Sequence, residues 1–156
     1  MYQGDGHTAI IYNDYFCRDQ IINRVINKNP CDMICYYTDF PESSFNFTDE
    51  NLSVQRFTPS ELFAHQEHDI LQSYMKNVLY IIEPDKNTAD GSLNRLAKTC
   101  RHYNITLIIV TQTALAIHPS TRHSISFVLK SKHCGTTINN KVRDAFVNAE
   151  IMSVDL

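Results

Sequence analysis

Three apolar runs of the sequence end on polar or charged residues that could do chemistry. One run ends on Glu83, a second ends on Gln112, and a third, residues 8–12, is followed by the polar segment NDYFCRDQ at residues 13–20. Carboxylate oxygens can bind Mg²⁺, whereas backbone N–H groups and cationic side chains bind phosphate. These residues form one site only if the fold brings the ends of the three runs together.

The sequence predicts an alternation of strands and helices. Apolar and β-branched runs predict strands at residues 8–12, 32–38, 53–57, 78–83, 105–111 and 124–129. Apolar residues at helical spacing predict helices over about residues 19–28 and 59–76, and two more that begin near Asp90 and Thr136. Strands that alternate with helices in this way form a mostly parallel sheet.

The expected fold is a three-layer α/β domain, with a mostly parallel sheet of about five strands and helices on both faces. A chain of 156 residues suits one such domain, spanning residues 1–156. Ligands of open parallel sheets bind at the carboxyl ends of the strands. The candidate site therefore consists of residues 13–20, 39, 83–85 and 112.

Composition and charge narrow the classes of function. Apolar residues make up 43% of the chain and charged residues 20%, which is typical of a globular domain. The formal net charge of −3 argues against affinity for nucleic acid over the whole surface. A weak DNA contact is left open by a mildly basic cluster near the C-terminus: Lys130, Lys132, Lys141 and Arg143.

The cell compartment is also an expectation from the sequence. No apolar run approaches the roughly 18 residues that cross a bilayer, and the first residues, MYQGDGHT, lack the pattern of a signal peptide. Five cysteines at irregular spacing do not form a disulfide framework, so we expect reduced thiols. These features predict a cytoplasmic protein with no membrane contact.

The order of these parts resembles the P-loop ATPases of the FtsK/HerA-like group, and most closely the genome-packaging ATPases of poxviruses and other large DNA viruses. The segment VLYIIEPD, residues 78–85, stands in the place of the acidic Walker B strand. The segment RHYNITLIIVTQ, residues 101–112, stands in the place of the Arg-His helix end and the strand that ends on a sensor glutamine. Arg122 stands where the family often has an arginine. The resemblance covers roughly residues 8–129.

The resemblance implies a phosphate-binding Walker A loop, GxxxxGK[ST], after the first strand. In one register Asn13 and Arg18 replace its glycines, while Asp19 and Gln20 replace the lysine and the Ser/Thr. In a register shifted by one residue, Cys17 replaces the second glycine, Arg18 the lysine and Asp19 the magnesium ligand. Neither register contains a glycine, and a carboxylate about 4 Å from a phosphate charge repels it by about 4 kcal/mol.

The Walker B segment also departs from the family pattern, in which two acids follow each other. Glu83 takes the first place, Pro84 takes the second, and Asp85 comes one residue late. We therefore expect a retained fold with ATP hydrolysis lost. The resulting hypothesis is a degenerate packaging-ATPase-like protein that acts as an interaction or structural component, with an active packaging ATPase, a capsid component or a second copy as its partner.

Two alternatives stay open. The chain could be an active ATPase that drives DNA packaging with ATP and Mg²⁺, in which Glu83, Asp85, Gln112 and Arg122 are catalytic and Arg18 replaces the lysine. It could instead be a plain α/β binding domain of other ancestry. Strand order separates this last alternative from the others, because the family places the strand of Gln112 between the first strand and the strand of Glu83.

The sequence gives less support to a metal site or to arginine fingers than to the hypotheses above. His65 and His68, in HQEHD, are three residues apart on a predicted helix, whereas metalloprotease histidines are four apart. We therefore expect no metal site there. Arg101 and Arg122 could act on the nucleotide of a neighbouring subunit, but an arginine on a solvated surface is the commoner case.

Overall fold

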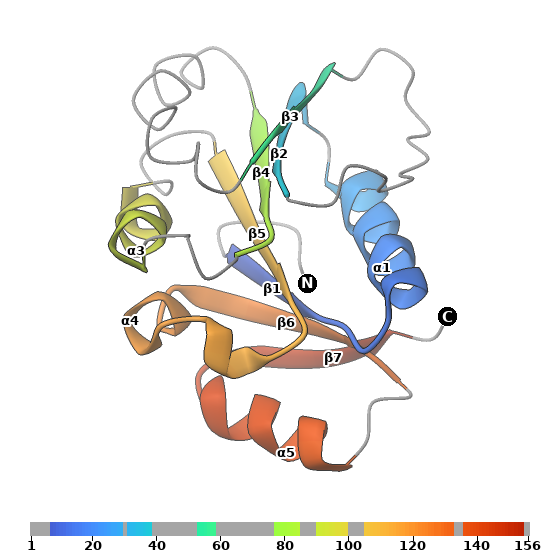
Figure 1. Cartoon of the computed structure of the whole chain (residues 1–156), viewed down its shortest axis with the longest axis vertical. Helices are drawn as coiled ribbons and strands as arrows, with labels where there is room; N and C mark the ends of the chain where they lie inside the picture. The colour runs from blue at the N-terminus through green and yellow to red at the C-terminus, as the bar shows by residue number, and fades with distance from the viewer. Residues whose placement is uncertain are drawn as a thin grey trace.

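The computed structural model describes residues 7–29, 31–38, 53–58, 77–84, 90–99, 105–132 and 136–154. These residues form a seven-stranded sheet in the order β3-β2-β4-β5-β1-β6-β7 (Figure 1). Each neighbouring pair of strands is parallel. The predicted mostly parallel α/β sheet is confirmed, but the expectation of about five strands is wrong.

The strands fall close to their predicted places. They are β1 (His7–Ile11), β2 (Met33–Tyr37), β3 (Ser53–Phe57), β4 (Val78–Ile82), β5 (Ile105–Thr111), β6 (Ile125–Ser131) and β7 (Glu150–Val154). Sequence analysis missed β7, which lies at one edge of the sheet beside β6. Its side chains are only exposed or half-buried, so its sequence lacks the continuous apolar run by which the central strands were predicted.

The order of the central strands can be compared with the order that the resemblance to packaging ATPases implies. Strand β5, which leads to Gln112, lies between β1 and β4. Its register pairs Ile109 with Ala9 on one side and with Ile82 on the other. The expected position of the Gln112 strand is therefore the observed one.

Helices lie on both faces of the sheet, as predicted (Figure 1). Helix α1 (Tyr15–Lys28) packs its buried residues on one face, and helices α3 (Asp90–Thr99) and α5 (Thr136–Ala145) pack on the other. The short turn η3 (Ala114–Ala116) and helix α4 (Pro119–Arg122) connect β5 to β6. The predicted helix over residues 59–76 lies outside the described residues.

Alternate residues of β1, β2, β4 and β5 enter the two apolar cores, as the pleat of a strand requires. On β1, Ile10 faces α1, while Ala9 and Ile11 face α3 and α5. Helix α1 contributes a buried stripe at helical spacing: Ile21, Ile22, Val25 and Ile26. This packing holds α1 with its N-terminal end directly after β1, where the candidate site lies.

A buried histidine joins three elements on the opposite face. The Nε2 atom of His7 lies 2.8 Å from the carbonyl oxygen of Ala97 in α3, and its Nδ1 accepts a hydrogen bond from the Leu107 N–H in β5 at 3.3 Å. His7 is 2% exposed. This side chain thus fixes α3 against the centre of the sheet.

No helix within the described residues has the length and apolar character needed to cross a membrane.

Candidate functional site

The carboxyl ends of the central strands lie at one edge of the sheet. The Tyr12 N–H donates to the Thr111 carbonyl at 3.2 Å, and the Glu83 N–H donates to the Tyr37 carbonyl at 2.9 Å. The residues just after β1, β2, β4 and β5 are consequently neighbours. This is the edge at which open parallel sheets bind their ligands.

The connection from β1 to α1 is a short turn, because β1 ends at Ile11 and α1 begins at Tyr15. The helix had been predicted to begin near residue 19, so most of the expected polar loop, residues 13–20, is helical instead. The physical reason is the cap, in which Asp14 Oδ1 accepts a hydrogen bond from the Cys17 N–H at 2.8 Å. An aspartate at the N-cap satisfies an N–H group that would otherwise lack a partner.

This short turn has a consequence for phosphate binding. Backbone N–H groups at a helix N-terminus bind phosphate only when they point to a free space. Here one of them is taken by the carboxylate of Asp14, whose Oδ2 also lies 3.5 Å from the Cys17 sulfur. The first turn of α1 therefore presents its own anion at the position where a P-loop would hold a nucleotide phosphate.

Arg18 turns inward from α1 and is 3% exposed. Its Nη1 lies 3.2 Å from Glu83 Oε1 and 3.4 Å from Oε2, while its Nη2 lies 3.0 Å from Asp19 Oδ1. Its Nε also donates to Asp19 at 3.0 Å, and the guanidinium carbon lies 5.9 Å from the centre of the Tyr12 ring. One arginine thus joins α1 to the end of β4.

Glu83 is surrounded by donors from β2 as well as from α1. The Tyr36 hydroxyl donates to its Oε1, and the Thr38 hydroxyl donates to its Oε2 at 2.9 Å. The carboxylate is 6% exposed. It is therefore held by three side chains of the chain, those of Tyr36, Thr38 and Arg18.

Burial and charge act against each other in this cluster. Burial raises the pKa of Glu83, although the Tyr36 hydroxyl, the Arg18 charge and the Thr38 hydroxyl each oppose the rise. Burial, together with the Glu83 charge, raises the pKa of Tyr36. Burial is the largest single effect on Arg18 and lowers its pKa, but the charges of Glu83, Tyr36 and Asp19 together outweigh it, so that the pKa of Arg18 is raised.

Arg18, the cation of this cluster, is already paired with two carboxylates, those of Glu83 and Asp19. A triphosphate at this edge would face a cluster of net negative charge. It would also have to take Arg18 away from a buried carboxylate, which costs several kcal/mol when the partner is left unpaired.

The remaining predicted site residues are not part of the cluster. Asn13 and Gln112 lie at the same edge but are exposed, and within the described residues Gln112 makes no hydrogen bond. Gln20 is half-buried on α1. Arg122 comes directly before β6 and thus lies at the opposite, amino edge of the parallel sheet. Asp39, Asp85 and Arg101, as well as the HQEHD segment, lie outside the described residues.

The contacts of Tyr36 and Thr38 with Glu83 are not predicted by the sequence patterns. The available signal was the end of the second predicted strand, Cys35-Tyr36-Tyr37-Thr38, which places a polar group at the same edge. The register of β2 with β4 then decides the contact, because it pairs Tyr36 with Ile81 and Tyr37 with Ile82. That pairing could not be derived from either strand alone.

Two residues of the predicted basic cluster make side-chain hydrogen bonds with their neighbours. Lys130 on β6 donates to the Ser153 hydroxyl at 3.0 Å, and Arg143 on α5 donates to the Asn140 side chain at 3.0 Å.

Within the part of the chain that the structure describes, no group of three His, Cys, Asp or Glu residues could hold a metal ion. Comparisons of the chain with protein-family models and with curated proteins find no match.

Proposed function

We propose that this chain is a P-loop-NTPase-like domain, of the type found in viral genome-packaging ATPases, that has lost ATP hydrolysis and acts as an interaction or structural component. The order of the strands supports this proposal. Counted from β2 to β6, the sheet runs through the strand of Glu83, the strand of Gln112 and the opening strand. This is the arrangement that the sequence resemblance implies.

The observation that carries the loss of hydrolysis is the buried ion pair between Arg18 and Glu83. In a working site of this class, the acid at the end of this strand holds the shell of the magnesium ion, and a cation from the first helix holds the phosphates. Here the two groups neutralise each other, and Tyr36 and Thr38 fill the remaining acceptor positions of the carboxylate. The chain's own side chains occupy the interactions that Mg²⁺-ATP would need.

The proposed partners are an active packaging ATPase, a capsid component or a second copy of this chain. A weak DNA contact through Lys141 and Arg143, which are exposed on α5, belongs to the same proposal. A domain without a nucleotide cycle can still hold other subunits in place. The partner role is tested by measuring binding to the separately purified packaging ATPase and capsid proteins encoded in the same genome.

Nucleotide binding is tested by thermal unfolding with and without Mg²⁺-ATP. A ligand at one hundred times its dissociation constant stabilises a protein by about 2.7 kcal/mol, which for a domain of this size raises the melting temperature by roughly 5–10 °C. We expect no shift for the wild-type chain at millimolar Mg²⁺-ATP, and no release of phosphate.

A melting temperature that rises with Mg²⁺-ATP, together with phosphate release that is lost in Glu83→Gln, would instead establish the active ATPase with unorthodox motifs. Stabilisation without phosphate release would mean that binding survives and only hydrolysis is lost. The matched control is Asp144→Asn, which removes one negative charge from an exposed position on α5, at the amino edge of the sheet.

A further inference from the structure

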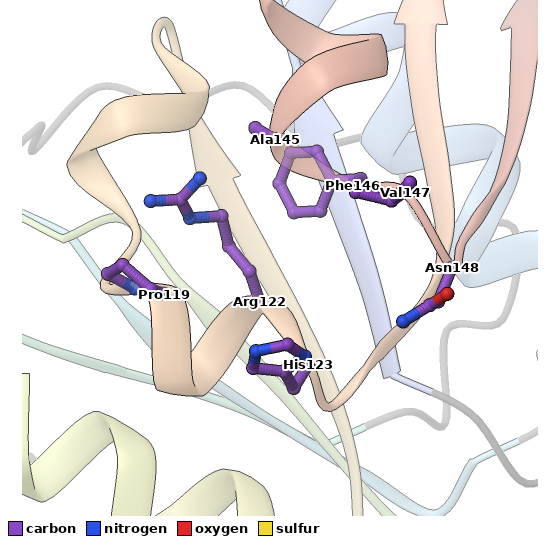
Figure 2. Close-up of a pocket in the computed structure, with 7 residues that line it drawn as sticks. All are labelled: Pro119, Arg122, His123, Ala145, Phe146, Val147 and Asn148. Carbon is purple, nitrogen blue, oxygen red and sulfur yellow. The ribbon is translucent and has the colours of Figure 1, made fainter.

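A hollow of about 190 Å³ lies at the amino edge of the sheet, opposite to the Arg18–Glu83 cluster. It is formed between α4 with the residue after it and the end of α5 with the turn that leads to β7 (Figure 2). The hollow is open to solvent and is lined by Pro119, Arg122, His123, Ala145, Phe146, Val147 and Asn148. None of these lining residues is acidic.

Arg122 is held so that part of its charge remains available. Its Nε donates to the Ile117 carbonyl at 2.9 Å, which fixes the plane of the guanidinium group. Within the described residues this is the one hydrogen bond of its side chain, and no carboxylate pairs with it. In Figure 2 its side chain extends between Pro119 and Phe146. Its two terminal nitrogens can therefore donate hydrogen bonds to a carboxylate in the planar geometry that suits this pair.

The other lining residues of the hollow are of mixed polarity. Phe146 is 2% exposed and forms the inner wall, while Val147 beside it is 82% exposed. His123 and Asn148 are polar and exposed. The exposed Val147 thus offers an apolar contact in the same hollow as the arginine.

The size of the hollow selects the kind of ligand. Sites that enclose small molecules are typically about 300–1,000 Å³, so this hollow is too small for a nucleotide or a similar cofactor. It has room for a side chain or two. A single arginine in the hollow also differs from the arginine clusters that bind phosphorylated segments.

We propose that this hollow is a docking site for an acidic side chain of a partner protein, in which a glutamate or aspartate pairs with Arg122 and a neighbouring apolar residue packs on Val147. The charge of Arg122 and the absence of acidic lining residues support binding of an acidic side chain. The exposed side chain of Val147 supports an additional apolar contact. The site does not depend on the loss of hydrolysis, because it lies at the other edge of the sheet.

The test is a selection of random 12-residue peptides on the immobilised full chain, with Arg122→Gln and Arg143→Gln as parallel targets. We expect the wild-type chain and Arg143→Gln to select peptides with Asp or Glu beside an apolar residue, and Arg122→Gln not to retain them. Arg143 is the matched control, because it is exposed on α5 and its loss changes the net charge by the same amount.

A selected peptide is then titrated into the ¹⁵N-labelled chain beside its analogue with Gln in place of the acid. We expect the acidic peptide to shift the amide signals of residues 122–124 and 146–148, and to bind at least tenfold more tightly than the analogue. Because Arg122→Gln could disturb α4, Val147→Glu provides a second variant at a highly exposed position. It should weaken binding at least tenfold by repulsion, whereas Val147→Gln should weaken it less.

Three results would overturn the proposal. The first is a selection without enrichment of acidic residues, and the second is an equal loss of binding in Arg143→Gln and Arg122→Gln. The third is binding of free acetate or inorganic phosphate as tight as that of the peptide, which would make the hollow a simple anion site. Failure of the ATP experiment leaves these outcomes unchanged, since the two measurements concern opposite edges of the sheet.

Discussion

At the scale of single residues, the Arg18–Glu83 pair is the feature that decides the character of the candidate site. Both side chains are almost fully buried, so each has lost its water and depends on the other. An arginine in this position cannot be understood from its neighbours in the sequence, because its main partner lies 65 residues away.

We expect a thermodynamic cycle to show strong coupling between these two residues. Arg18→Met should reduce the free energy of unfolding by about 3–5 kcal/mol, because it leaves the buried Glu83 without its cation. Glu83→Met should cost less, because Arg18 keeps its ion pair with Asp19. The double variant should lose less than the sum of the two, since neither member of the buried pair is left without the other. Urea denaturation measures all four proteins, and additive losses would show that the pair is not coupled.

The pKa of Glu83 also predicts how stability depends on pH. Because burial raises this pKa above its ordinary value of 4.5, the folded state favours the protonated carboxyl. The resulting stabilisation is complete below pH 4.5 and is lost as the pH rises through the folded-state pKa. We expect the wild-type chain to lose stability relative to Glu83→Gln as the pH rises from 4.5 to the folded-state pKa of Glu83.

Urea denaturation at a series of pH values, from about 4 to 8, provides the measurement. The difference in unfolding free energy between the wild type and Glu83→Gln should fall with rising pH and then level off. A difference that increases with pH would mean that the pKa is lowered in the folded state, and that Arg18 and the two hydroxyl donors outweigh the effect of burial.

At the scale of elements, the start of α1 separates this chain from a phosphate-binding loop. The helix begins at Tyr15 because Asp14 provides a good cap, and the segment lacks the glycines that a wrapped loop requires. The turn and the buried pair act together, because an early helix start places Arg18 one turn inside α1, where it can reach Glu83.

We expect Asp14→Ala to reduce the free energy of unfolding by about 1 kcal/mol, whereas Asp14→Ser should stay close to the wild type because serine also caps helices. Urea denaturation gives both values. An equal loss in the two variants would show that the carboxylate of Asp14 stabilises the fold through its charge rather than as a cap.

The bounds of the strands and helices show which elements the sequence patterns predict correctly. The strand over residues 53–57 and the strand over residues 105–111 have the predicted bounds. For residues 105–111 the reason is the β-branched run ITLIIVT, which lies between polar segments and leaves little ambiguity. The start of α1 was placed too late, since NDYFCRDQ lacks an apolar stripe and its helical state depends on the Asp14 cap and on the buried Arg18 contacts. Strand β7 was missed because half-buried edge strands have weak patterns.

At the scale of the whole molecule, stability should be unevenly distributed across the sheet. Strands β1 and β4 are buried along their whole length, whereas the side chains of the edge strand β7 are exposed or half-buried. We expect native-state hydrogen exchange to be slowest in β1 and β4 and to proceed through local opening in β7. Equal protection in β4 and β7 would contradict this prediction.

The sequence by itself determined the alternation of strands and helices, the absence of glycine from residues 13–20, and the proline in the place of a second acid. These are local properties, and local chemistry is enough to derive them. Only the tertiary structure decided that Arg18 pairs with Glu83 and that Tyr36 and Thr38 complete the cluster. Strand order and register determine which distant side chains meet, and they follow from the packing of the whole sheet.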